Sequence, residues 1–359
     1  MKVLVDGRSI DRTGIGTYTK LLLKGILPKL EKVYLMGSFI EKPFEGVNII
    51  HTSNSIYSIE EQINTFIAEL RVKNEVDLVH YVNYNKSILS VLPFVITIHD
   101  LIQFKFSYSS GLKRKIGETI LKSSLKHSSA VICVSNSTKN DLLDLFGVDE
   151  NKVFVVYNPA LNPFSKEVRE VNVKEKYNLG KYILSVGNRK KHKNLSFLID
   201  SMELISKQFP ELSLVIIGKR FDEEDEVDFA LRRSSVKDKI LVLENVSYEE
   251  LVSFYKNAEI VLVPSLYEGF GLVPFESINF GTLPLVSDIK TFRELFFEDN
   301  DLFFDPYSIE SLVRKIEEFY NYEKRKTKIE KLKKYLDIYS YDRFINDTFK
   351  VYEFALKNR

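Results

Sequence analysis

Two carboxylates eight positions apart, Glu268 and Glu276, flank a glycine-rich segment with the composition of a phosphate-binding loop. The apolar run at 260–263 predicts a buried strand, and the stretch 275–280 predicts a helix that Gly281 ends. Glu268 is therefore expected in a strand-to-helix loop, and Glu276 in the first turn of the helix. Glycines let backbone N–H groups approach a ligand, and a helix N-terminus carries partial positive charge, so the pattern favours a diphosphate. A rim charge or a helix cap is the alternative.

A second candidate is the segment 185–194, in which a predicted strand and a glycine precede a dense basic loop. Fixed cations at the carboxyl end of a strand stabilise charge that grows on a departing diphosphate. The cations concerned are Arg189, Lys190 and Lys193, and the alternative is a solvated basic loop.

The segment 267–276 resembles the E-x7-E signature of retaining glycosyltransferases of family 4, which have the two-domain GT-B fold. The resemblance implies that Glu268 reaches hydroxyls of a donor sugar and that Glu276 holds the ribose of its nucleotide. It also implies that the intervening backbone binds the diphosphate. That backbone comprises Gly269, Phe270, Gly271 and Leu272.

The basic segment matches the same family at Lys193-Asn194, where a lysine is implied to stabilise the leaving diphosphate in catalysis. The family's usual arginine is missing, because position 188 is asparagine; Arg189 or Lys190 is the candidate to replace it. Two further matches imply nucleoside contacts at Gly218, after the apolar run 214–217, and at Val246.

Two candidate segments lie in the first half of the chain. Gly14 and Gly16 are predicted in a turn between the first strand and a helix, which suits phosphate or is a plain loop. His99 ends a predicted strand, the expected ligand edge of a doubly wound sheet, although a lone histidine is more often structural. In the family, the matching glycines face the donor phosphate or the acceptor, and the matching histidine contacts the donor sugar, so His99 is expected to be catalytic.

Short apolar runs alternate with amphipathic stretches along all 359 residues, which predicts two doubly wound α/β units in series. The runs predicted as strands are 3–5, 33–36, 47–50, 78–81, 94–98, 131–134 and 153–156 in the first half, and 182–186, 213–217, 240–243, 260–263 and 283–287 in the second. Two prolines and two asparagines at 157–163 predict the boundary. An N-terminal Rossmann-like domain, 1–158, is implied to bind the acceptor, and a second, 159–340, the nucleotide sugar. In GT-B enzymes these domains face each other across a cleft, and the C-terminal helix, here 341–359, packs back on the first.

Composition limits the possible functions. The 51 basic and 50 acidic residues nearly cancel, which argues against a nucleic-acid partner. Cys133 is expected in a buried strand, and no leader or membrane span is predicted, so a cytoplasmic protein is expected. The basic helix 111–127 is expected to be a solvated face; the alternative is peripheral contact with the inner face of the cell membrane.

No cofactor is expected. The acidic run 221–226 is expected to be solvated, since a metal site needs ligands that converge from a fixed scaffold. GT-B enzymes generally need no metal, so the resemblance implies a metal-independent transferase.

Together these features predict a retaining hexosyltransferase that uses a nucleotide sugar and a glycan or lipid-linked acceptor. The segments 5–8, 14–16 and 187–194 resemble bacterial mannosyltransferases of surface-polysaccharide assembly, which favours GDP-mannose. UDP-glucose or a UDP-N-acetylhexosamine is the alternative donor. A GT-B epimerase and a non-catalytic partner subunit are the alternative functions.

Overall fold

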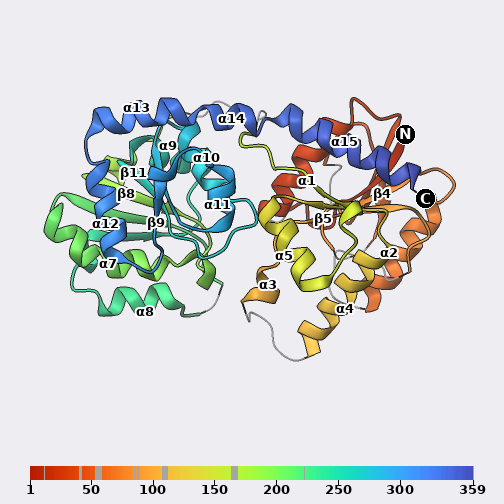
Figure 1. Cartoon of the computed structure of the whole chain (residues 1–359), viewed down its shortest axis with the longest axis horizontal. Coiled ribbons are helices and arrows are strands. Elements are labelled where there is room, and N and C mark those ends of the chain that lie inside the picture. Colours follow the sequence, from red (N-terminus) through yellow and green to blue (C-terminus); the bar gives the residue numbers. More distant parts are fainter. Residues whose placement is uncertain are drawn as a thin grey trace. The chain divides into compact units, whose positions relative to one another are not determined.

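The computed structural model describes residues 1–11, 13–39, 43–52, 59–84, 86, 89–106, 112–162, 169–221 and 223–358. The chain forms two compact units, of which the first comprises Met1–Asn158 and Tyr341–Arg359 and the second Pro159–Ser340. Figure 1 shows both units, coloured by position in the sequence. The first unit therefore takes its last helix from the far end of the sequence, and the units divide inside the proline- and asparagine-rich segment. Pro163 of that segment lies outside the described residues.

Seven parallel strands form the sheet of the first unit, in the order β3-β2-β1-β4-β5-β6-β7. β2 and β3 lie on one side of β1 and β4 to β7 on the other, so the order reverses between β1 and β4, where Val5 pairs with His80. Such a switch point is where doubly wound sheets bind ligands. All seven strands were predicted to within two residues. They are β1 (Lys2–Asp6), β2 (Lys32–Gly37), β3 (Val47–His51), β4 (Leu78–Tyr81), β5 (Phe94–Ile98), β6 (Ala130–Cys133) and β7 (Val153–Val155).

Helices cover both faces of this sheet, which is why its strands are mostly apolar on both faces. Val3 and Val5 face one core with α1 and α15, and Leu4 faces the other core with α2, α4 and α5 (Figure 1). Cys133 is buried in the second core, as predicted. The helices are α1 (Thr13–Ile26), α2 (Ile59–Val72), α3 (Ile102–Lys105), α4 (Leu112–His127), α5 (Asn136–Phe146) and α15 (Tyr341–Lys357).

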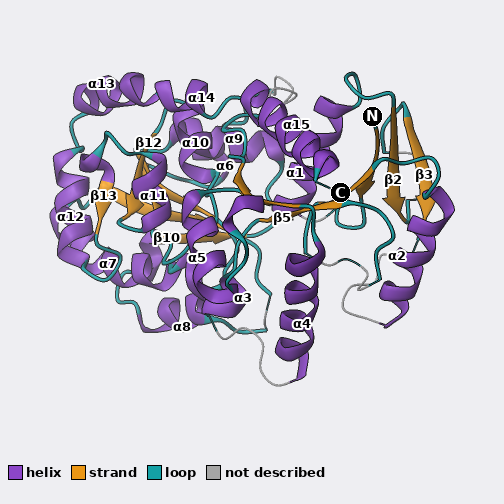
Figure 2. Ribbon diagram, turned by 45° about the vertical axis from the view of Figure 1, so that its right-hand side comes forward, coloured by secondary structure: helices purple, strands orange, loops and turns teal. Residues whose placement is uncertain are grey.

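The C-terminal helix α15 packs on β4, β5 and β6 and beside α1 (Figure 2). The sequence places Tyr341, Ile345, Phe349, Tyr352 and Leu356 on one helical face. The structure leaves Tyr341, Phe349 and Leu356 only partly buried, so the buried face is turned from that stripe. Ile345 and Tyr352 are buried as predicted. The other apolar residues of the buried face are Phe344, Val351 and Ala355.

Six parallel strands form the sheet of the second unit, in the order β10-β9-β8-β11-β12-β13, with a switch point between β8 and β11. The prediction of two doubly wound α/β units is therefore confirmed. The two-residue strand β13 was missed, because two residues carry no periodic pattern. The strands are β8 (Lys181–Val186), β9 (Leu212–Ile217), β10 (Ile240–Leu243), β11 (Ile260–Val263), β12 (Leu283–Ser287) and β13 (Phe303–Phe304).

Helices of the second unit also lie in two layers, with α7 and α12 in mutual contact on β9 and β13, and α10 and α13 on β12 (Figure 1). In the described part of the chain, no helix combines the length and apolar character that a membrane span requires. The helices are α6 (Val173–Lys176), α7 (Leu195–Gln208), α8 (Glu226–Arg233), α9 (Tyr248–Asn257), α10 (Val273–Asn279), α11 (Lys290–Leu295), α12 (Ile309–Glu318), α13 (Tyr322–Leu332) and α14 (Lys334–Ile338).

Candidate active site

Lys193 and Glu268 meet at the switch point of the second sheet. Lys193 follows β8, and Glu268 follows β11, the neighbouring strand across the switch point. The Lys193 Nζ lies 2.6 Å from the Glu268 Oε1, and the two side chains are 18% and 11% exposed. Residues 75 positions apart thus form one charged pair at the edge where such sheets bind ligands.

The Glu268 carboxylate is fixed in place by more than the ion pair. The Ser265 hydroxyl donates to the same oxygen, Oε1, at 2.7 Å, and the Thr291 hydroxyl donates to the Glu268 carbonyl oxygen at 2.7 Å. Burial alone would raise the pKa of Glu268, but the Lys193 charge and the hydrogen bonds from Lys193 and Ser265 lower it below the ordinary glutamate value. Glu268 is therefore ionised at neutral pH, with Oε2 not engaged by these partners.

Glu276 lies in the first turn of α10, as predicted, although the helix begins two residues before the predicted start. The Tyr255 hydroxyl, from α9, donates to Glu276 Oε2 at 2.7 Å. Burial raises the pKa of Glu276, and the Tyr255 hydrogen bond and the Lys193 charge oppose that rise. Tyr255 was not singled out in the sequence, since a tyrosine on the buried face of a helix has the pattern of a core residue.

The loop between the two glutamates presents backbone rather than side chains. The Phe270 ring is buried and stacks on Phe275, with ring centroids 5.3 Å apart. Gly271 has a φ of 84°, which a residue with a Cβ rarely adopts. Within the described residues, the N–H groups of Gly271 and Leu272 have no hydrogen-bond acceptor. These groups are available to an anion.

The nucleoside candidates Gly218 and Val246 follow β9 and β10, at the same edge of the sheet as Lys193. Gly218 donates its N–H to the Leu243 carbonyl at 2.9 Å, and Gly187 donates to Ile217 at 3.0 Å. A Cβ added to Gly218 would lie 1.9 Å from the Gly187 carbonyl oxygen. Glycine is therefore required at position 218 for the ends of β8 and β9 to approach each other.

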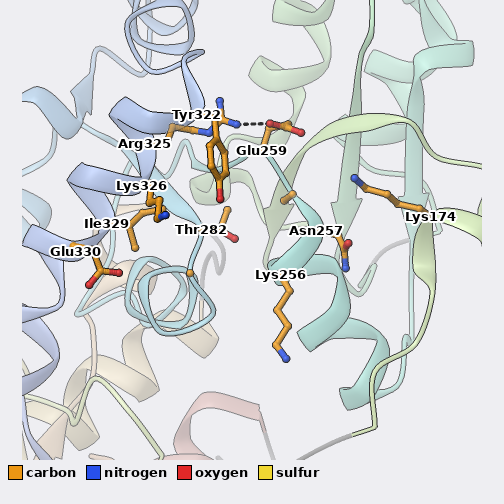
Figure 3. A pocket seen from close by; sticks show the side chains of 12 residues that line it. Lys174, Lys256, Asn257, Glu259, Thr282, Tyr322, Arg325, Lys326, Ile329 and Glu330 are labelled. Carbon is orange, nitrogen blue, oxygen red and sulfur yellow. Dashed lines mark hydrogen bonds and ion pairs between the residues drawn. The ribbon is translucent and has the colours of Figure 1, made fainter.

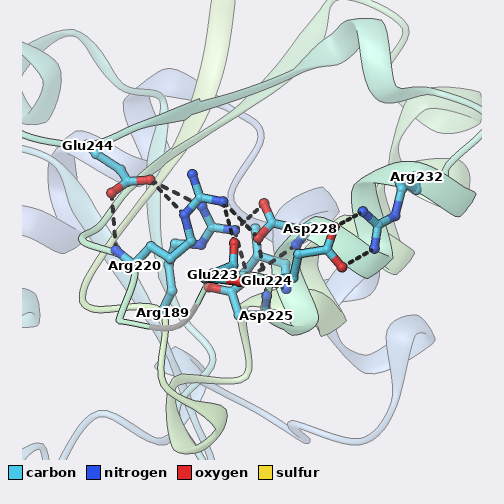
Figure 4. Close-up of polar contacts among 9 residues, drawn as sticks. Arg189, Arg220, Glu223, Glu224, Asp225, Asp228, Arg232 and Glu244 are labelled. Atoms are coloured by element: carbon cyan, nitrogen blue, oxygen red, sulfur yellow. Dashed lines mark hydrogen bonds and ion pairs between the residues drawn. The ribbon is translucent and has the colours of Figure 1, made fainter.

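Arg189 lies among carboxylates, which the sequence did not predict (Figure 4). Its guanidinium pairs with Asp225 at 2.7 Å and Asp228 at 2.5 Å, and its side chain is 3% exposed. Glu244 lies 3.5 Å from it and also pairs with Arg220. The prediction that the acidic run is only solvated is wrong for Asp225, which also caps α8; Asp222 lies outside the described residues. A diphosphate contact by Arg189 stays a prediction.

We expect Arg189→Met to lower the free energy of unfolding by about 3 kcal/mol, because it leaves buried carboxylates without their cation. Nucleotide affinity of the folded variant should change little. Lys191→Ala is the control, since Lys191 is 71% exposed and its pair with Glu226 is worth little. Urea unfolding and calorimetric titration with GDP separate the two effects. A large loss of affinity at unchanged stability would instead support the diphosphate role.

The first-unit glycines are placed differently from the prediction. Helix α1 begins at Thr13, so Gly14 and Gly16 lie in its first turn and not in a loop before it. A Cβ on Gly16 would lie 2.3 Å from the Ile10 carbonyl oxygen, whereas one on Gly14 would meet nothing within 4 Å. Gly16 therefore has a packing role, and Gly14 leaves the helix N-terminus open.

His99 follows β5 at the carboxyl edge of the first sheet, as predicted. Its Nε2–H donates to the Val82 carbonyl at 2.8 Å, and its ring packs edge-on against Tyr18 at 4.7 Å. Burial lowers the pKa of His99 to about 4, so the imidazole is neutral at physiological pH. With Nε2 carrying the proton, Nδ1 is the acceptor that His99 can offer to a hydroxyl group.

A buried polar chain that the sequence did not reveal lies beside His99. Tyr18 hydrogen-bonds Thr97 at 3.1 Å, and Thr97 contacts His80 Nε2 at 2.8 Å. His80 Nδ1 contacts the Tyr352 hydroxyl at 2.6 Å. Burial lowers the pKa of His80 to about 3, so this histidine is neutral and its partners are all uncharged. The chain joins α1, two strands and α15 around the site.

A pocket of about 340 Å³ in the second unit lies away from these residues (Figure 3). Its lining includes Glu259 and Thr282, which precede β11 and β12, so it is at the amino edge of the sheet, opposite Lys193 and Glu268. Arg325 pairs with Glu259 there. Lys256 is in the last turn of α9, where a cation stabilises the helix C-terminus. We therefore assign these charges to the fold.

Three remaining expectations concern metals, the serine-rich segment and the membrane. Among the described residues, no group of three or more His, Cys, Asp or Glu is placed to hold a metal ion. The segment 134–142 predicts a helix capped by Ser135 or Ser137, with a structural role. Ser135 does cap α5, by accepting from the Thr138 N–H. In the basic helix α4, Lys122 pairs with Glu118, while Gly111 and the side chains of Lys113 and Arg114 lie outside the described part. Membrane contact stays a prediction.

Comparisons with known proteins bear on the family and the fold. Residues 41–160 match the model described as glycosyltransferase family 4, and residues 167–335 match that of glycosyl transferases group 1. The chain belongs to these glycosyltransferases. An O-antigen chain mannosyltransferase of Salmonella typhimurium is 31% identical over 56% of this chain and 53% of its own length. A GDP-mannose:cellobiosyl-diphosphopolyprenol alpha-mannosyltransferase of Xanthomonas oryzae is 26% identical over 56% of this chain and 51% of its own.

This glycosyltransferase therefore spans about half the length of those two relatives. Among solved structures, a sucrose-phosphate synthase from Thermosynechococcus elongatus superposes with a TM-score of 0.77 at 14% identity, covering 98% of each chain. At that identity the likeness is one of fold. The two Rossmann-like sheets and this neighbour agree with the predicted GT-B class.

Proposed function

We propose that this glycosyltransferase moves a hexose from a nucleotide sugar to a glycan or lipid-linked acceptor, with retention of anomeric configuration. The observation that carries the proposal is the Lys193–Glu268 pair at the switch point of the second sheet. It supplies an ionised carboxylate and a cation at one place, as sugar hydroxyls and a diphosphate require. Neither group is needed to fill a core, because both lie at the ligand edge of the sheet.

In this proposal the second unit holds the donor. The ammonium group of Lys193 and the N–H groups of Gly271 and Leu272 stabilise the charge that grows on the departing diphosphate. Glu268 accepts hydrogen bonds from sugar hydroxyls through its second oxygen. Glu276 holds the ribose. Gly218 lets the ends of β8 and β9 lie close together, where the nucleoside would bind.

The bond between the anomeric carbon and the diphosphate oxygen breaks, and a bond from the acceptor oxygen to that carbon forms on the same face. The proton of the acceptor hydroxyl passes to the leaving phosphate oxygen, so no separate base is needed. Lys193 contributes more as negative charge develops, which is the condition for lowering the barrier. His99, from the first unit, would offer Nδ1 to a hydroxyl of the donor sugar or acceptor.

GDP-mannose is the proposed donor. The segments 5–8, 14–16 and 187–194 favour it, and both relatives reported above are named as mannosyltransferases, one of them for GDP-mannose. UDP-glucose and a UDP-N-acetylhexosamine are the alternatives, because the contacts with diphosphate, ribose and sugar do not depend on the base. Metal independence and a cytoplasmic location are parts of the same proposal.

A thermal-shift panel tests the donor, with UDP, GDP, ADP and their common sugar conjugates, each with and without EDTA. A ligand that binds only the native state stabilises it by about 2.7 kcal/mol at about 100 times its Kd. We expect GDP and GDP-mannose to raise the melting temperature, and EDTA to leave the shift unchanged.

Each other outcome has a distinct meaning. A shift with uridine nucleotides alone would change the donor and keep the mechanism. A shift that EDTA abolishes would overturn metal independence. No shift with any nucleotide would overturn the proposed enzymatic activity and favour a non-catalytic partner subunit. NMR of the product anomer, once transfer is detected, tests retention.

A further inference from the structure

The Glu276 carboxylate is held by a side chain outside the E-x7-E segment. Tyr255 is fully buried, and its hydroxyl donates to Glu276 Oε2 at 2.7 Å. No other hydrogen bond to this carboxylate is found among the described residues, so Oε1 has no partner there. The Tyr255 hydrogen bond therefore fixes Oε2, and Oε1 can accept a hydrogen bond from a ligand.

The tyrosine is itself held rigidly. Its backbone carbonyl accepts from the Thr282 hydroxyl at 2.6 Å, and its ring lies 5.4 Å from that of Phe280. Thr282 precedes β12 and Phe280 follows α10, so both belong to the connection that leaves the helix carrying Glu276. A phenylalanine would fill the same space, which leaves the hydroxyl as the feature that packing does not explain.

The first glutamate of the pattern, Glu268, is arranged in the same way. Its Oε1 accepts from both Lys193 and Ser265, and no hydrogen bond to its Oε2 is found among the described residues. Each of these two glutamates is thus anchored through a single oxygen. A carboxylate whose rotation is fixed in advance loses less entropy when it accepts a hydrogen bond from a ligand.

We propose that Tyr255 is a positioning residue for nucleotide binding, which orients Glu276 so that its free oxygen accepts hydrogen bonds from the ribose hydroxyls. This inference rests on the proposed function, in which Glu276 holds the ribose. Tyr255 acts through Glu276 and does not itself touch the nucleotide.

The hydroxyl also favours the ionised form of Glu276. The groups that act on this carboxyl are the Tyr255 hydroxyl, from α9, and the Lys193 ammonium, from the loop after β8, and both oppose the pKa rise caused by burial. Removing the hydroxyl therefore raises the pKa of Glu276 further. Nucleotide affinity should fall on acidification as Glu276 is protonated, and in Tyr255→Phe this fall should begin at a higher pH.

Calorimetric titration of the full chain with GDP and with 2′,3′-dideoxy-GDP tests the proposal. We expect Tyr255→Phe to weaken GDP binding about 10-fold, the effect of one hydrogen bond to a charged group. The variant and the wild-type protein should bind the dideoxy analogue equally. In a Glu276→Gln background, Tyr255→Phe should have no further effect on GDP affinity.

Tyr182→Phe is the matched control. Tyr182 is also fully buried in the second unit, and its hydroxyl donates to the Phe254 carbonyl at 2.9 Å. It should lose comparable stability and keep wild-type GDP affinity. UDP and its dideoxy analogue replace the guanosine pair if the donor panel selects uridine.

Two results would overturn the role of Tyr255 alone: unchanged GDP affinity in Tyr255→Phe, or an equal loss for GDP and the dideoxy analogue. A wild-type protein that binds neither GDP nor UDP would overturn the proposed function, and the role of Tyr255 with it. If Tyr255→Phe fails to fold, the ribose contact is tested by comparing GDP with dideoxy-GDP in the other proteins. Dideoxy-GDP should bind more weakly than GDP to the wild-type protein, and the two should bind equally to Glu276→Gln. Equal binding of GDP and dideoxy-GDP to the wild-type protein would then overturn the proposal.

Discussion

Glu268→Gln lowers the rate of sugar transfer by about 10²–10³-fold, the effect of removing one preorganised electrostatic contact. Glutamine keeps the size of the side chain and can still accept from Ser265, so the second unit stays folded. What is lost is the negative charge beside Lys193 and the strong acceptor for sugar hydroxyls. Transfer of radiolabelled mannose from GDP-mannose, at saturating donor, measures the loss in kcat.

The partner variant separates catalysis from stability. Lys193→Met leaves Glu268 buried without its cation, which costs about 3–5 kcal/mol of stability, and combining it with Glu268→Gln should restore part of that. Transfer by the double variant should be about as slow as by either single one, since the pair acts as a unit. Glu226→Gln is the control, because Glu226 is 48% exposed in the pair with Lys191. Near-normal turnover in both single variants would overturn the assignment.

The same pair predicts a pH dependence. Because the folded-state pKa of Glu268 is lowered, its ion pair contributes stability that is present above the ordinary glutamate pKa and is lost as pH falls through the folded value. The stability difference between wild type and Lys193→Met should therefore be largest near neutral pH and shrink in acid.

Gly218→Ala should strongly destabilise the second unit, although it adds only one methyl group. Its Cβ would lie 1.9 Å from the Gly187 carbonyl oxygen, a backbone atom that cannot rotate away. Both glycines are tied by their own N–H groups to neighbouring strands, so the ends of β8 and β9 must separate. We expect a loss of about 3 kcal/mol, at the upper end of typical overpacking costs, measured by urea unfolding.

Gly180→Ala is the control for that measurement. Gly180 immediately precedes β8, and a Cβ there would meet nothing within 4 Å. A small gain or no change is expected, since alanine lowers the entropy of the unfolded chain. Equal stability of the two variants would show that the strand ends move apart without cost.

The local patterns of the chain predicted the fold well. Strands of parallel sheets are apolar on both faces, so they appear as uninterrupted runs, and every strand except the two-residue β13 was predicted. The doubly wound order follows from the alternation of strands and helices. The segment from Glu268 to Glu276 was likewise placed as predicted, after β11 and into the first turn of α10, because local geometry folds it.

Side-chain contacts between distant residues were decided by the tertiary structure. Arg189 stands in a basic loop, yet α8 brings Asp225 and Asp228 against it and gives it a structural partner in place of solvent. Tyr255 and Tyr352 have the pattern of core residues, and only packing places their hydroxyls on Glu276 and His80.

The sequence by itself determined which groups stand at the carboxyl ends of the strands, since strand order along the chain and the spacing of residues after each strand are local properties. The tertiary structure decided which of those groups touch. Lys193 and Glu268 are 75 residues apart, and their distance is set by β8 and β11 becoming neighbours in the sheet. The Lys193 charge then holds the pKa of Glu268 low against the effect of burial, because desolvation and a neighbouring charge act on that pKa only once the sheet has formed.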